Sequence, residues 1–174
     1  NLRAEFSEMG HAHPSTGGKG RGTQEMKTND ITGRFPRGRI GLGAELGRPG
    51  TGTRFRDVEK VTAALASLDI EFEKANPVYA LFADPATGKL KDDVLNEKVL
   101  SAIVEFSTQS EKLPAALKAL RDVAKQIDTV VSVGMCCVLD PDGASPAETI
   151  ARSAGFAVRP HGKNNIGLGR PLAK

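Results

Sequence analysis

The chain has 174 residues, which suits one domain of ordinary size, and 39% of them are hydrophobic. Two cysteines in this length argue against a disulfide-stapled scaffold, and no apolar run is long enough to span a bilayer. The net charge of +3 at pH 7 is unevenly distributed along the chain.

Three segments differ in charge. Residues 1–56 carry ten Lys and Arg against five Asp and Glu, residues 57–158 carry ten against sixteen, and residues 159–174 carry four against none. An acidic body therefore lies between two basic ends, a pattern that bears on association rather than on fold. We predict a basic arm over residues 1–55, a domain over residues 56–160 and a basic tail over residues 161–174.

The arm is rich in glycine, since residues 1–53 hold twelve of the nineteen glycines. Such a sequence buries too little apolar surface to offset its ordering entropy, so we expect it to be extended or disordered until a partner orders it. That partner would be its own body, a neighbouring subunit or a polyanion.

Two tetrapeptide motifs recur in the two basic ends of the chain. Ile40-Gly41-Leu42-Gly43 returns at residues 166–169, and Leu46-Gly47-Arg48-Pro49 returns at residues 168–171. Chance is the simpler interpretation, because Gly- and Arg-rich sequence repeats easily. The alternative is that both segments dock on a sheet edge or an apolar groove, with Ile and Leu on one side. The partner-binding residues would then be Arg34, Arg37, Arg39, Ile40, Leu42, Arg48, Ile166, Leu168 and Arg170.

The first half of the body alternates short elements. Helical spacing predicts a helix from Asp57, which would be its N-cap. Strands are expected at 70–73 and 78–83, followed by a turn at 84–88 and a short helix at 91–98.

The second half begins with a strand–helix–strand unit. Alternation predicts a strand over 99–108, and a stripe at steps of three and four predicts a helix over 112–127. The run 129–139 is apolar on both faces, which suggests a central strand covered from two sides. A crossover helix of this length would make the two strands parallel.

A turn at 140–143 then leads to the clearest local signal, Ser145-Pro146-Ala147-Glu148, which predicts a capped helix ending at Gly155. A last strand is expected at 156–158. This order of elements predicts an α+β fold of the ferredoxin-like kind, an α/β sandwich with helices on one face of a mostly antiparallel sheet.

Candidate ligand residues are few. Cys136 and Cys137 with His161 could form a thiol or metal site, and His11 with His13 could hold Cu(II) or Ni(II). Adjacent strand cysteines point to opposite faces, so a buried apolar role is favoured for them, and a solvated tail is favoured for the histidines. Asp140 is interpreted as part of a turn. No glycine-rich segment fits a phosphate-loop pattern, and no cofactor is predicted.

The sequence favours a non-enzymatic interaction or assembly protein that forms a homo-oligomer or joins a larger complex. One alternative is binding of nucleic acid, for which the arm offers basic residues but only Phe35 and Phe55 for base stacking. Another is an enzyme or small-molecule binder near Cys136, Asp140 and His161. We expect no membrane association and a cytoplasmic protein, although a cleaved export signal would leave no trace in this sequence.

Overall fold

A computed structural model describes residues 2–8, 13–14, 33–48 and 50–159. Within these residues the fold is α+β, with the helices α1 (Leu2–Ser7), α3 (Phe55–Ala66), α4 (Leu113–Val123) and α5 (Pro146–Ser153). The main sheet contains β1 (Arg39–Leu46), β3 (Glu71–Phe72), β7 (Ala102–Gln109) and β8 (Val131–Cys136) in the spatial order β3-β7-β1-β8. All its neighbouring strands pair antiparallel.

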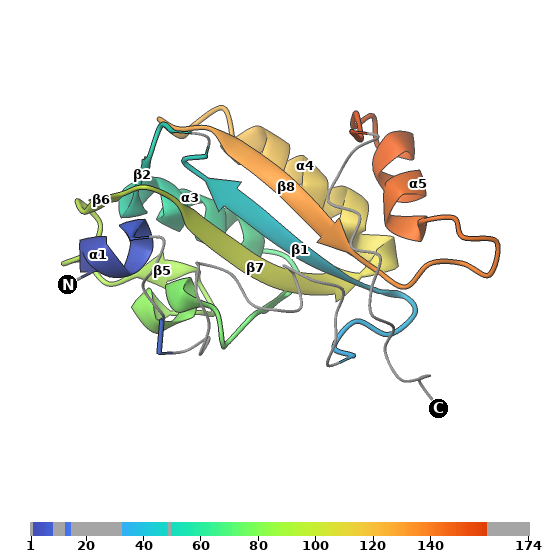
Figure 1. Cartoon of the computed structure of the whole chain (residues 1–174), viewed down its shortest axis with the longest axis horizontal. Helices are drawn as coiled ribbons and strands as arrows, with labels where there is room; N and C mark the ends of the chain where they lie inside the picture. Colours follow the sequence, from blue (N-terminus) through green and yellow to red (C-terminus); the bar gives the residue numbers. More distant parts are fainter. Residues whose placement is uncertain (1, 9–12, 15–32, 49, 160–174) are drawn as a thin grey trace.

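β1 is the central strand of the sheet (Figure 1). Leu42 lies opposite Phe106 of β7 on one side and opposite Met135 of β8 on the other. Part of the segment expected to be an arm, residues 39–48 and 50–55, is thus built into the folded body. Strand alternation explains this placement, because Ile40 and Leu42 fall on one face and the intervening glycines on the other.

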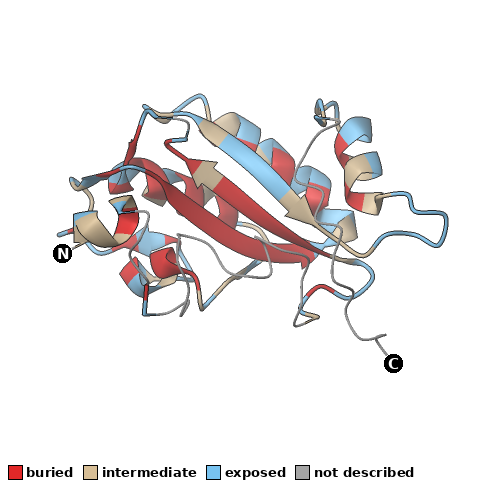
Figure 2. Ribbon diagram, viewed as in Figure 1, coloured by how far each residue is buried: buried red, intermediate tan, exposed pale blue. Residues whose placement is uncertain are grey.

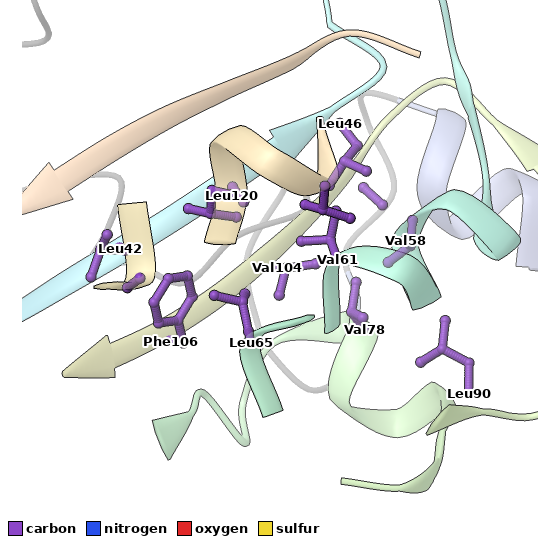
Figure 3. Packing of buried hydrophobic residues seen from close by; sticks show 14 of the residues in the cluster. Leu42, Leu46, Val58, Val61, Leu65, Val78, Leu90, Val104, Phe106 and Leu120 are labelled. Carbon is purple, nitrogen blue, oxygen red and sulfur yellow. The ribbon is translucent and has the colours of Figure 1, made fainter. Parts of the chain in front are cut away.

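Helices α3 and α4 cover one face of this sheet (Figure 1). The apolar residues of β1 and β7 on that face meet Val58, Val61 and Leu65 from α3 and Leu117 and Leu120 from α4 in one hydrophobic core. Figure 3 shows Leu42 and Phe106 of the strands together with Val61, Leu65 and Leu120 of the helices in this core. The helix stripes predicted from residue spacing therefore face the sheet.

The remaining strands form two small antiparallel pairs. β2 (Thr53–Arg54) pairs with β6 (Lys98–Val99), and β4 (Phe82–Asp84) pairs with β5 (Lys89–Leu90) around the turn at 84–88. The expected strand at 78–83 is instead mostly the 3-10 helix η1 (Pro77–Leu81), capped by the Asn76 side chain, which accepts a hydrogen bond from the Val78 N–H. The short helix expected at 91–98 is absent from the described chain, which forms turns there.

The predicted N-terminal capping residue is correct for one helix, α5, and wrong for another, α3. The Ser145 Oγ accepts the Glu148 N–H at 3.3 Å, Pro146 opens α5, and Gly155 follows its end at φ 76°, all as predicted. At α3 the helix is confirmed but the cap is wrong, because Arg54 occupies that position and Asp57 lies inside the first turn. Asp57 is only 3% exposed and pairs with Lys60.

The strand–helix–strand unit is present as β7, the 3-10 turn η2 (Ser110–Lys112), α4 and β8. β7 and β8 run in the same direction, as predicted, because both are antiparallel to β1, which lies between them. The expectation that residues 129–139 form a central strand covered from two sides is wrong. β8 ends the sheet in the described chain, and three of its six residues are exposed (Figure 2). The segment expected as a final strand, 156–158, has no regular structure.

Candidate functional site

The outer edge of β8 is the most distinctive surface of the described chain. β8 has a strand neighbour on its β1 side and, among the described residues, no strand on the other side. An edge strand presents a row of backbone N–H and C=O groups that can pair with another chain. This surface, residues 131–136, is called the β8 edge below.

The register fixes which backbone groups face outward. The Gly47 N–H donates to the Val130 carbonyl at 2.9 Å, so Val130 points toward β1. Antiparallel strands alternate, so Ser132 and Gly134 also face β1, whereas the backbone groups of Val131 and Val133 face outward, as do those of Met135. The β8 edge therefore offers three outward pairs of N–H and C=O groups in an unbroken register.

The side chains along the edge are partly apolar. Val133 is 39% exposed and Val130 is 42% exposed, although both are β-branched residues that strands normally bury on at least one face. Gly134 lies on the face opposite Val133, which it shares with Val130 just before β8, and it has open space where a side chain would be. Such a strand has few of the charges, prolines or bulges that usually protect sheet edges from pairing.

The strand is held firmly at its start. The Thr129 hydroxyl donates to the Gly52 carbonyl at 2.6 Å, just before β8 begins. Val131 and Met135 also pack against the hydrophobic core. The edge is thus a pre-formed strand, so a pairing partner meets little ordering cost on this side of the interface.

Two of the predicted partner-binding residues are used inside the chain itself. Ile40 is 1% exposed and Leu42 is fully buried, so both belong to the core. Their glycine neighbour Gly41 does allow a close approach, because a Cβ there would lie 2.5 Å from the Phe35 ring. The space beside this glycine is thus filled by an aromatic side chain of the same chain, whereas the prediction had another backbone approaching there.

Three of the predicted arginines, Arg34, Arg37 and Arg39, lie at or just before the start of β1. Arg34 pairs with Glu73 and Arg37 with Asp140, while Arg39 pairs with Glu71 and donates to the Ser107 hydroxyl. Arg48 is exposed. Ile166, Leu168 and Arg170 lie outside the described residues. The ion pairs of the first three arginines tie the start of β1 to the acidic body.

A hollow of about 490 Å³ lies beside these arginines on the sheet face away from α3 and α4. Glu105 is 3% exposed at its wall and accepts a hydrogen bond from the Asn76 amide at 2.8 Å. Its rim carries the Arg34–Glu73 and Arg39–Glu71 pairs, so charges of both signs meet there. Because each sign is matched by the other, the hollow has no net preference for an anion or a cation.

The two aromatic residues considered for base stacking are buried. The Phe35 ring is 6% exposed, next to Gly41. Phe55 is fully buried against Phe6, with ring centroids 5.1 Å apart. Neither ring is available for stacking in this conformation, because stacking needs an accessible ring face.

The two candidate cysteines lie next to the outer edge of the sheet. Cys136 lies at the end of β8, and the Cys137 thiol lies 3.5 Å from the Ser145 hydroxyl on the core side. Cys136 shares the face of Gly134, so the two thiols lie on opposite faces, as strand alternation predicts. Among the described residues no group of three or more His, Cys, Asp or Glu side chains could hold a metal ion.

The predicted histidines are distributed differently. His13 is 8% exposed, packs its ring against Phe6 and lies 3.7 Å from a Glu5 oxygen, so the solvated tail expected for it is not what the structure has. His11 and His161 lie outside the described residues. Asp140 forms the predicted turn, where its carbonyl accepts the Gly143 N–H at 2.9 Å.

The shifted carboxyl groups lie away from the β8 edge. The Lys112 ammonium lowers the pKa of Asp69, a hydrogen bond from the Thr87 hydroxyl lowers that of Asp84, and the Lys118 ammonium lowers that of Asp122. Asp69 is exposed, whereas Asp84 and Asp122 are half-buried at the surface, and each pKa is lowered by a neighbour in a surface contact, which argues for structural rather than catalytic roles.

Sequence reasoning missed the β8 edge because it placed this strand in the centre of the sheet. The run of valines gave no hint of exposure. No described helix has the length and apolar character needed to cross a membrane. Comparison with protein-family models, with curated proteins and with solved structures finds no match to this chain.

Proposed function

We propose that this protein is a non-enzymatic assembly protein that joins copies of itself through the β8 edge. The observation that carries the proposal is the row of outward backbone groups at Val131, Val133 and Met135 on a strand whose Val133 side chain is exposed. Strand addition at such an edge uses main-chain hydrogen bonds for affinity and alternate side chains for specificity.

The charge distribution supports association between like chains. The body carries a surplus of acidic residues and the two ends carry a surplus of basic residues. Complementary potentials between one copy's ends and another copy's body speed encounter and fix orientation. A homo-oligomer with closed symmetry is the commonest result of such self-complementarity.

We also propose that the body has the ferredoxin-like arrangement. The main-sheet strands and the two long helices follow one another as β1, α3, β3, β7, α4 and β8, and the strand order β3-β7-β1-β8 places the two halves side by side. This split β-α-β arrangement supports the assignment. Because such folds host many functions, the assignment adds nothing to the assembly proposal.

The test compares two substitutions at one outward-facing position. Val133→Pro removes the outward N–H but leaves the β1 ladder intact, since proline is tolerated where the N–H faces away from the neighbouring strand. Val133→Thr keeps the N–H and the β-branched shape. Light scattering should show an oligomer for the native chain and Val133→Thr, and a monomer for Val133→Pro.

Thermal melting of each variant checks that it is folded. A native chain that stays monomeric over the accessible concentration range contradicts the proposal. An oligomer that survives Val133→Pro in a folded chain also contradicts it, because assembly would then use another surface.

A further inference from the structure

We infer that the β8 edge pairs with the C-terminal segment of a second copy, residues 166–172, which contains the tetrapeptide Ile166-Gly167-Leu168-Gly169. The inference rests on the proposed function, because it names the partner of the same edge. The same tetrapeptide, Ile-Gly-Leu-Gly, also occurs in β1, which is the strand that pairs with the inner edge of β8.

The β1 pairing supplies the template. On the inner edge Leu42 lies opposite Met135 and Gly43 lies opposite Gly134. A segment with the same tetrapeptide, antiparallel to β8 in the equivalent register, would place Leu168 opposite Met135 and Gly169 opposite Gly134. Leu168 then lies on the helix-covered face, beside the exposed Val133. Burial of this leucine and of the valine supplies the apolar part of the contact.

The proline in the segment fits this register. Hydrogen-bonded pairs on the outer edge involve Val131, Val133 and Met135, because their backbone groups face outward. Pro171 would lie opposite Ser132, which is a non-hydrogen-bonded position. Its missing N–H would point away from β8, where an edge strand tolerates proline. A shift by one residue would place the proline where a donor is required.

Charge complementarity favours the same register. Residues 159–174 carry four basic residues and no acidic ones, and β8 is flanked in the sequence by Asp128 and Asp140, which are both exposed. In this register Lys163 would lie beyond the Cys136 end of β8, toward Asp140, and Lys174 beyond the Val131 end, toward Asp128. Asp140 already accepts one hydrogen bond from Arg37 at 3.2 Å and can accept another from a lysine.

The segment is long enough to leave its own body. From Arg159, the last described residue, to Ile166 the extended chain spans about 25 Å. Each copy has one tail and one β8 edge, so reciprocal exchange between two copies satisfies both edges and closes the assembly at a dimer.

A disulfide between two engineered cysteines tests the register. Gly134→Cys combined with Gly169→Cys, with Cys136 and Cys137 replaced by serine, places the cysteines at a non-hydrogen-bonded pair. Its Cα separation of about 4.5 Å falls within the range of disulfides. Gly134 has room for the side chain. We expect a covalent dimer on a non-reducing gel after mild oxidation.

The matched control moves one cysteine by two residues on the same face. Gly134→Cys with Gly167→Cys should cross-link much more slowly, because the diagonal Cα separation is about 7–8 Å. In the chain with native cysteines, Leu168→Asp should weaken dimerisation by at least about tenfold, since burying a charged side chain opposes the contact. Asn164→Asp, which adds the same charge outside the strand, should have a much smaller effect.

Three outcomes would overturn the inference. A disulfide formed within one chain means that the tail pairs with its own β8. A dimer that Val133→Pro abolishes, but that forms no disulfide and ignores Leu168→Asp, means that assembly at the β8 edge stands while another segment supplies the strand. A monomeric native chain removes the proposed function together with the inference.

Discussion

The neighbouring strands β1 and β8 contradict what their compositions suggest. β1 contains two glycines in eight residues and comes from the glycine-rich part of the chain, yet most of it is buried in the centre of the sheet. β8 comes from a run of valines, yet three of its six residues are exposed. The burial of a strand therefore depends on its place in the sheet, which composition alone does not determine.

Removing apolar volume from β1 should lower the free energy of unfolding much more than removing it from β8. Leu42→Ala should lower the free energy of unfolding by about 2–5 kcal/mol, because Leu42 is fully buried and truncation leaves a cavity. Val133→Ala in β8 should cost less than about 1 kcal/mol, because Val133 is already 39% exposed. Urea unfolding followed by circular dichroism measures both, under conditions where the chain is monomeric. Equal losses would mean that β8 is buried in solution.

The glycines of the two strands offer a second, smaller contrast. Gly41→Ala should cost about 1–3 kcal/mol, since the new Cβ would lie 2.5 Å from the Phe35 ring and the ring must move. Gly134→Ala meets nothing within 4 Å and should be neutral or slightly stabilising, because glycine weakens a strand. The same unfolding measurement decides the matter. A stabilised Gly41→Ala would show that Phe35 does not rest on β1.

The hydrogen bond made by Thr129 at the start of β8 offers a third contrast between β8 and β1. Thr129→Val removes the hydroxyl that donates to the Gly52 carbonyl at 2.6 Å, at a cost of about 0.5–1.5 kcal/mol. Amide exchange should quicken at the start of β8 and stay unchanged in β1. If exchange in β1 quickens equally, the two strands open as one unit.

Acid should produce the smallest effect and should leave the contrast between β1 and β8 intact. Asp69, Asp84 and Asp122 have pKa values lowered below 3.8 in the folded chain. Their stabilisation is present above the unfolded value of 3.8 and is lost as the pH falls through the lower folded values. Asp84→Asn should therefore flatten the fall in stability below pH 3.8. If the variant loses stability below pH 3.8 as steeply as the native chain, the Thr87 contact is not maintained in solution.

Local chemistry made several elements predictable from sequence. Ser145, Pro146 and Gly155 defined α5, because a cap, a first-turn proline and a left-handed residue act within a few positions of one another. The apolar stripe predicted over 112–127 defined α4 in the same way, although the α-helix ends at Val123. The turn at 140–143 also followed from its own residues. The α+β class rested on these local elements.

The candidate site was not predictable in this way. Placing β8 in the centre required knowing that no other segment would take that position, and β1 takes it through pairings with residues far along the chain. The tetrapeptide Ile40-Gly41-Leu42-Gly43 did indicate an extended segment that accepts a close neighbour. It could not indicate that the neighbour is Phe35 of the same chain.

Residue patterns alone were enough for the turns at 84–88 and 140–143, the start of α5 and the apolar faces of α3 and α4, since these depend on contacts between residues a few positions apart. Only the tertiary structure decided that a glycine-rich strand is central and a valine-rich one is at the edge. The reason is that strand pairing joins residues about sixty to ninety positions apart, and hydrogen bonds along a backbone are open to any sequence that fits the register.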